Sequence, residues 1–237
     1  MLRGEGVNKV FGGLIAISEA DFYVGQGEIV GLIGPNGAGK TTLFNLISGA
    51  LTPLSGTITF NGENITGLKP HQICRKGVAR TFQSTKLFGG LTVFENVLLA
   101  SQFGDAQAKS GSEAEQEVMA LLDFVELSAE WASIAKDLPV ASQRRVEIAR
   151  ALATKPQLLL LDEVMAGLNP TEVAQAMELI VKLRDRGMTI FMIEHVMKAI
   201  MNVCDRIMVL HHGEMLAEGT PSDIAKSKTV IEAYLGE

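Results

Sequence analysis

Eight residues in the first fifth of the chain constrain its fold more than any other segment. Residues 34–41 read GPNGAGKT and fit the pattern G-x-x-x-x-G-K-[ST], between an apolar run and the amphipathic segment TTLFNLISG. In such a strand–loop–helix setting, glycines let backbone N–H groups surround phosphate oxygens, while Lys40 reaches the β- and γ-phosphates and Thr41 offers a hydroxyl to Mg²⁺. The alternative, a glycine-rich turn without a nucleotide, is disfavoured by this context. The residues predicted to bind phosphate are Gly34, Pro35, Asn36, Gly37, Ala38, Gly39, Lys40, Thr41 and Thr42.

Strands and helices alternate along most of the chain. Short apolar runs predict buried strands at 27–34, 157–163 and 187–195. Apolar residues at helical spacing predict helices at 113–126, 143–153 and 171–186. This alternation predicts an α/β fold with a mainly parallel, doubly wound sheet, which binds ligands at the carboxyl ends of its strands.

Turn residues add three local expectations. Asn61 and Gly62 predict a hairpin, and the segment 206–219 predicts a closing hairpin with Gly213 at its turn. Residues 104–111, GDAQAKSG, are expected to form a loose surface loop.

Composition excludes several classes of function. Hydrophobic residues make up 47% of the 237 positions and charged residues 20%, so the chain can bury a sizeable core as one large domain or two small ones. The net charge of −6 argues against a protein that coats nucleic acid or docks broadly on an anionic membrane surface. Cys74 and Cys204 lie far apart without metal-ligand spacing, which favours two reduced thiols. No signal peptide or apolar run of membrane-spanning length is present, so any membrane role is expected to pass through a partner rather than direct insertion.

Polar residues at strand ends supply the candidate chemistry. In LLLLDE, Asp162 closes a buried apolar run and fits an acid that helps to hold Mg²⁺, while Glu163 could polarise the attacking water. Gln83 in ARTFQ and His195 in MIEH also end apolar stretches, although single residues of these types are more often structural. Phe11 alone would be assigned to the core.

Together these motifs resemble the ATP-binding-cassette ATPases, the nucleotide-binding subunits of ABC transporters. The resemblance covers nearly the whole chain and rests on six segments in the family's order: GPNGAGKTT, ARTFQ, RRVEIARAL, LLLLDE, AGLNP and IEH. It implies a single cassette with a mainly parallel core sheet and an antiparallel β portion. The nucleotide-binding core would comprise 1–83 and 157–237, with a helical subdomain inserted at 84–156.

The resemblance also assigns roles to individual residues. It implies ATP and Mg²⁺ as ligands, with Phe11 stacking on adenine and Glu163 acting as the catalytic base. It implies that Gln83 senses Mg²⁺ or water and contacts the membrane subunit, and that His195 contacts the γ-phosphate. The segment 166–169, AGLN, would cross to the opposing subunit.

A narrower resemblance links the chain to the branched-chain amino acid uptake ATPases. The segments that support this resemblance include GVARTFQSTKLFGGLTVFENVLLA, IEHVMKAIMNVCDRIMVLHHGEMLAEGTP and the ending IEAYLGE. It implies a subunit at the cytoplasmic face of the inner membrane, bound to transmembrane permease subunits and a second ATPase subunit. A periplasmic binding protein would deliver the solute, a branched-chain amino acid or a similar small polar solute such as urea or an amide.

Three other functions stay open from the sequence. The chain could serve an exporter of lipid or polysaccharide, or act as a soluble ABC ATPase in DNA repair or translation. It could also be a regulatory module that holds ATP without turnover.

One segment departs from the family pattern. Alignment on RRVEIARAL places LPVAS, residues 138–142, where the family has LSGGQ. Proline donates neither a hydroxyl nor a backbone N–H, and side chains on Val140 and Ala141 restrict approach of the backbone to phosphate. The helix N-terminus remains as an anion site. The segment is therefore expected to bind the partner's ATP weakly, through the residues Pro139, Val140, Ala141 and Ser142. Val164, where the family usually has proline, is a second departure.

This pattern predicts an asymmetric pair. Each ATP site borrows its signature segment from the opposite subunit, so the degraded segment affects the partner's nucleotide. We expect a heterodimer in which this chain hydrolyses ATP against a partner with a better signature.

Overall fold

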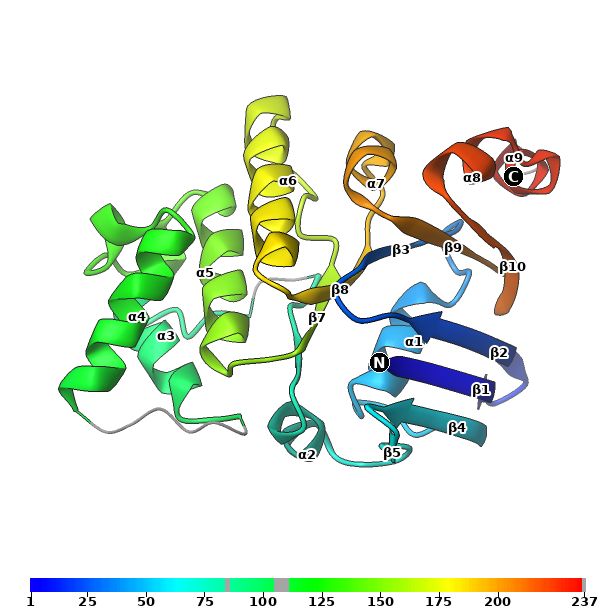
Figure 1. Cartoon of the computed structure of the whole chain (residues 1–237), viewed down its shortest axis with the longest axis horizontal. Coiled ribbons are helices and arrows are strands. Elements are labelled where there is room, and N and C mark those ends of the chain that lie inside the picture. The colour runs from blue at the N-terminus through cyan, green and yellow to red at the C-terminus, as the bar shows by residue number, and fades with distance from the viewer. Residues whose placement is uncertain (84–85, 105–110, 236–237) are drawn as a thin grey trace.

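A computed structural model describes residues 1–83, 86–104 and 111–235, which form two sheets and the helices around them (Figure 1). Residues 105–110 of the expected surface loop lie outside the described residues. The larger sheet has the strand order β10 (Glu214–Gly219), β9 (Arg206–His211), β3 (Ile29–Ile33), β8 (Thr189–Ile193), β7 (Leu158–Asp162) and β6 (Val78–Arg80). The smaller sheet has the order β2 (Leu14–Val24), β1 (Leu2–Phe11), β4 (Ser55–Phe60) and β5 (Glu63–Asn64).

The larger sheet confirms the predicted α/β core. Its strands β9, β3, β8, β7 and β6 pair in parallel, and only β10 pairs antiparallel, to β9. Every residue of β3, β7 and β8 is buried, because helices and the second sheet cover both faces of a parallel sheet. The three predicted buried strands are therefore present, and their carboxyl ends lie side by side at one edge of the sheet.

The smaller sheet is antiparallel and packs over α1 (Lys40–Ile47). Side chains of α1 such as Phe44 share one buried cluster with Phe60 of β4 and Phe191 of β8, so α1 lies between the two sheets. The antiparallel portion implied by the family resemblance is thus confirmed. The other face of the parallel sheet packs against α6 (Pro170–Asp185) and α7 (Met197–Val203), followed by α8 (Pro221–Lys226) and α9 (Lys228–Leu235).

Helices fill the chain between β6 and β7. They are α3 (Val93–Ser101), α4 (Ser112–Phe124), α5 (Val140–Ala153) and the short 3₁₀ turns η1 (Ser128–Glu130) and η2 (Ala135–Asp137), and Figure 1 shows them gathered at one side. The division of the chain at 84 and 156 stays a prediction. The helix expected at 143–153 begins three residues earlier, at Val140, because the extended backbone of Pro139 serves as its N-cap.

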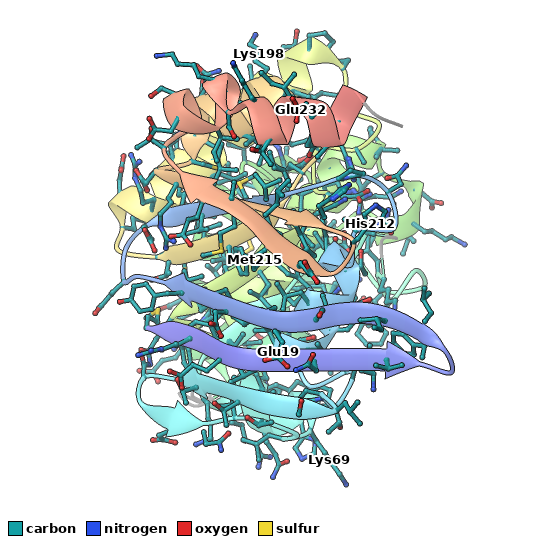
Figure 2. The ribbon with its side chains drawn as sticks, turned by 90° about the vertical axis from the view of Figure 1, so that its right-hand side faces the viewer. Glu19, Lys69, Lys198, His212, Met215 and Glu232 are labelled. Atoms are coloured by element: carbon teal, nitrogen blue, oxygen red, sulfur yellow. The ribbon has the colours of Figure 1, made fainter. Side chains whose placement is uncertain are left out.

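Both predicted hairpins are present. Asn61 and Gly62 have φ angles of 51° and 80° and connect β4 to β5, and Gly213, with φ 84°, lies in the turn between β9 and β10. Figure 2 shows the β9–β10 hairpin beside β2 of the antiparallel sheet, with His212 at its turn. In the described part of the chain, no helix combines the length and the apolar character needed to cross a membrane.

Candidate active site

The glycine-rich segment forms a tight loop between β3 and α1. A Cβ on Gly34 would lie 2.0 Å from the carbonyl oxygen of Leu210, and one on Gly39, whose φ is 107°, would lie 2.4 Å from that of Ala16. Only glycine fits both positions, because backbone atoms of neighbouring strands cannot move aside. The Gly213 N–H donates to the Ala38 carbonyl at 2.9 Å, so the β9–β10 turn supports the loop from outside.

Lys40 lies within this loop. Its side chain is buried, and its Nζ donates to the carbonyl oxygens of Gly34 at 2.6 Å and Pro35 at 2.9 Å. A buried ammonium held by neutral carbonyls gains from an anionic acceptor, because charge-assisted hydrogen bonds are stronger than neutral ones. The loop is therefore built for an anion such as a phosphate. Thr41 and Thr42 follow in the first turn of α1, where Thr41 is exposed.

Asp162 ends β7 at the same edge of the sheet where the loop follows β3, and it is almost fully buried. Its Oδ2 pairs with Arg80 Nη2 at 2.7 Å, and its N–H donates to Thr81 Oγ1 at 3.1 Å. Its other carboxylate oxygen, Oδ1, is buried without a hydrogen-bond partner among the described residues. An unpaired buried carboxylate oxygen is costly, and it is the donor type that Mg²⁺ prefers.

The three predicted catalytic side chains converge. Glu163 Oε2 accepts from Gln83 Nε2 at 2.7 Å, and Glu163 Oε1 lies 2.9 Å from His195 Nε2. Glu163 has a φ of 51°, which is uncommon for a residue other than glycine and marks a special turn after β7. Residues that follow β6 and β8 thus hold the carboxylate that follows β7 by both of its oxygens.

Helix α5 anchors the main chain of Gln83. Arg144 Nη1 donates to the Phe82 carbonyl at 3.1 Å and Nη2 to the Gln83 carbonyl at 2.7 Å, while Glu147 Oε1 accepts from the Lys86 N–H. Sequence reasoning did not single out Arg144 as a support for Gln83, because this contact joins residues 61 positions apart.

Glu194 immediately precedes His195 at the end of β8. It is 2% exposed, and its carboxylate accepts from the N–H groups of Met165 at 2.8 Å and His195 at 3.3 Å. Burial raises the pKa of Glu194 to about 7, against these stabilising hydrogen bonds. The sequence analysis did not single out Glu194, because nothing in the motif MIEH distinguishes it from other polar residues at strand ends.

The raised pKa of Glu194 predicts a pH-dependent stability. From about pH 4.5 to 7 the folded chain holds a proton that the unfolded chain has released, so the free energy of unfolding falls as pH rises. We therefore expect the free energy of unfolding of the wild type, relative to that of the Glu194→Gln variant, to fall by about 3 kcal/mol between pH 4.5 and 8. Urea unfolding of both proteins across this pH range measures the difference. Glu115→Gln, at an exposed site on α4, controls for loss of a carboxylate. A difference between wild type and Glu194→Gln that is constant with pH would contradict the expectation.

Two predicted groups stand apart from this cluster. Phe11 ends β1 with its ring partly exposed, where Lys9 Nζ lies 5.2 Å from the ring centroid. At the start of α5, the N-cap Pro139 and the first residue Val140 are exposed, whereas Ala141 and Ser142 are half-buried; Val140 is 51% exposed. Among the described residues, no hydrogen bond joins these four to Gln83, Glu163 or His195.

Known proteins resemble this chain in sequence and in fold. A model of the ABC transporter family matches residues 17–166, and a model described as branched-chain amino acid ATP-binding cassette transporter matches residues 214–237. The chain is 43% identical to the high-affinity branched-chain amino acid transport ATP-binding protein LivG of Salmonella typhimurium, with 100% of this chain and 98% of the relative covered. It is 42% identical, with the same shares covered, to the corresponding protein BraF of Pseudomonas aeruginosa.

The fold is also similar to that of a solved ATP-binding cassette. The ADP conformation of an ATP-binding cassette from an ABC transporter superposes with a TM-score of 0.91 at 30% identity, covering 100% of this chain and 99% of that chain.

Proposed function

The chain belongs to the ABC transporter family of ATP-binding cassettes, and on that premise we propose that it powers uptake of branched-chain amino acids or a similar small polar solute. As a member of this family it binds and hydrolyses ATP. The observation that carries the ATPase part of the proposal is the convergence of Gln83 and His195 on Glu163, at the sheet edge where the loop 34–41 follows β3. The solute class is supported by the likeness of residues 214–237 to branched-chain amino acid cassettes.

Hydrolysis needs a base for the attacking water. In this reading Glu163 accepts a proton from the water, the new oxygen–phosphorus bond forms at the γ-phosphorus, and ADP leaves with the electrons of the broken bond. Gln83 and His195 fix both oxygens of Glu163, which orients the base before the substrate arrives. Lys40 and the backbone N–H groups of the loop bind the phosphates, and Phe11 offers its exposed ring to the adenine.

The residues present fit a magnesium ion. The unpaired Oδ1 of Asp162 and the exposed hydroxyl of Thr41 are hard oxygen donors, and the amide of Gln83 adds a third. When bound, the ion would neutralise charge on the β- and γ-phosphates. Asp162, Thr41 and Gln83 would hold it.

Partner subunits complete the machine. Cassettes of this family work as dimers with transmembrane permease subunits. We assign this chain to a heterodimer at the cytoplasmic face of the inner membrane, fed by a periplasmic binding protein. The segment 139–142 supports the asymmetric pairing, because the side chains of Val140 and Ala141 block the close backbone approach that glycines would give.

A groove beside Gln83 suits the permease. It has a volume of about 650 Å³ and lies between α2 (Pro70–Arg75), α3, α5 and the segment before α3. Its exposed apolar lining includes Phe82, Phe88, Leu99 and Phe103, which is the surface that an amphipathic helix needs. Docking there would touch the same segment that carries Gln83.

Substituting Phe103 tests this docking site. Phe103→Asp should weaken co-purification with the permease at least tenfold, because a charge replaces an apolar contact, while ATP binding by the isolated chain stays within about twofold. Phe103 is 58% exposed, so the fold tolerates the change. Leu54→Asp, at a 71% exposed site outside the groove, is the matched control and should leave assembly intact. Equal loss in both variants would contradict the assignment.

Reconstitution tests the proposed function as a whole. The chain and its permease subunits are co-purified and reconstituted into liposomes. We expect this transporter to hydrolyse ATP faster, and the liposomes to accumulate labelled leucine, when solute-loaded binding protein is added. Stimulation by a lipid or polysaccharide and none by leucine, urea or amides would instead favour the exporter. The relatives that are 42–43% identical to this chain are branched-chain amino acid transport proteins and favour the importer, whereas the lipopolysaccharide export protein LptB of Escherichia coli is 34% identical.

A further inference from the structure

We propose that Arg80 is a positioning residue that fixes the metal-binding carboxylate of Asp162 and connects it to the wall of the permease groove. The second half of this inference rests on the proposed function; the first half depends only on nucleotide binding. Arg80 ends β6, three residues before Gln83, and Asp162 ends the neighbouring strand β7.

Arg80 joins two elements of the nucleotide site. Its Nη2 donates to Asp162 Oδ2 at 2.7 Å, while its Nη1 donates to Asn45 Oδ1 at 2.7 Å and Ser48 Oγ at 3.0 Å. Asn45 and Ser48 lie at the end of α1, the helix that begins with Lys40 of the phosphate loop. One guanidinium therefore sets the distance between the loop helix and the metal-binding strand.

The pairing is one-sided. The guanidinium contacts only Oδ2, so the second oxygen of Asp162 stays unpaired for a cation, and the Arg80 Nε is itself buried without a hydrogen-bond partner among the described residues. The side chains are 6% and 1% exposed, and buried ion pairs give little net stability because desolvation offsets their attraction. Two unsatisfied buried atoms are not expected of a pair kept for stability alone. Holding one oxygen restricts the broad terminal torsion of the aspartate and leaves the other aimed at its ligand.

The same guanidinium reaches the groove. Its central carbon lies 5.3 Å from the ring centroid of Phe82 and 5.6 Å from that of Phe44, distances typical of cation–π contacts. Both Arg80 and Phe82 line the groove, and the Phe82 ring is partly exposed to it. A helix docked against Phe82 would therefore press on the group that orients Asp162.

The first test measures binding of a fluorescent ATP analogue to the purified chain as Mg²⁺ is titrated. Arg80→Met should raise about tenfold the Mg²⁺ concentration at which the Mg²⁺-dependent increase in analogue binding is half-maximal. The affinity for the analogue in EDTA should stay within about twofold of the wild-type value. Arg80→Lys keeps the buried charge but lacks the planar fork that reaches Asp162 and α1 together, so an intermediate shift is expected. It also serves as the informative variant if Arg80→Met does not fold.

The outcomes separate the possibilities. An unchanged Mg²⁺ requirement in both variants, or an equal loss of binding in EDTA, would overturn the positioning role and leave Arg80 structural. The link to the groove is tested in the reconstituted transporter with Phe82→Leu, which removes the aromatic face. Solute-stimulated ATPase should fall several-fold with the Mg²⁺ requirement of the isolated chain unchanged. Unaltered stimulation would overturn the link. Because the Mg²⁺ titration uses no permease or solute, its result is independent of the proposed import function.

Discussion

Replacing Glu163 with glutamine is expected to lower ATP turnover by the assembled transporter by about 10²- to 10⁴-fold, the usual contribution of a general base. Glutamine keeps the size of the side chain and can still accept a hydrogen bond from Gln83 through its carbonyl oxygen, but it cannot take a proton from water. ATP binding should persist, because the loop 34–41 and Lys40 are unchanged. Steady-state phosphate release gives the rate, and equilibrium binding of labelled ATP gives the affinity.

The matched control is Glu178→Gln, an exposed carboxylate on α6 away from the three-residue cluster. It should retain turnover within about twofold, as expected for a surface substitution. If Glu163→Gln lost less than tenfold, or lost ATP binding to the same degree as turnover, Glu163 would not be the base.

The strongest sequence predictions concerned strands whose residues are buried on both faces. Short apolar runs such as LLLLD are typical of strands buried on both faces of a parallel sheet, so β3, β7 and β8 could be predicted from these runs. The three strands are neighbours and their carboxyl ends are aligned. The polar residues that follow them therefore lie at the same edge of the sheet. The meeting of Glu163 and His195 follows from that geometry.

The supporting residues were out of reach of sequence reasoning. Arg80, Arg144 and Glu194 act through partners 82, 61 and 29 positions away, and nothing in local periodicity reveals such pairings. The long strands β1 and β2 were not identified individually either. Their pairing contains bulges, with Glu19 at a φ of 42°, so the alternation of apolar residues is interrupted.

The second prediction, unequal turnover at the two ATP sites, follows from the residues at the start of α5. Pro139 caps the helix in an extended conformation, and the exposed Val140 and the half-buried Ala141 occupy positions where the family resemblance implies glycines. Only backbone N–H groups and the partial positive charge of the helix end remain to bind a phosphate from the partner. This chain's own site, by contrast, has a complete loop, Asp162 and the Glu163 cluster.

Turnover should therefore be unequal between the two sites of the proposed heterodimer. Changing the partner's equivalent of Glu163 to glutamine is expected to reduce phosphate release less than about twofold, against the loss of at least about 10²-fold for Glu163→Gln in this chain. The combined change Pro139→Ser, Val140→Gly and Ala141→Gly should then raise the partner's share, since it restores a hydroxyl and close backbone approach. Val140→Ala alone, which restores neither, controls for altered packing at the helix end. Equal losses from the two glutamine variants would rule out the asymmetry, because both sites would then contribute alike despite their different signature segments.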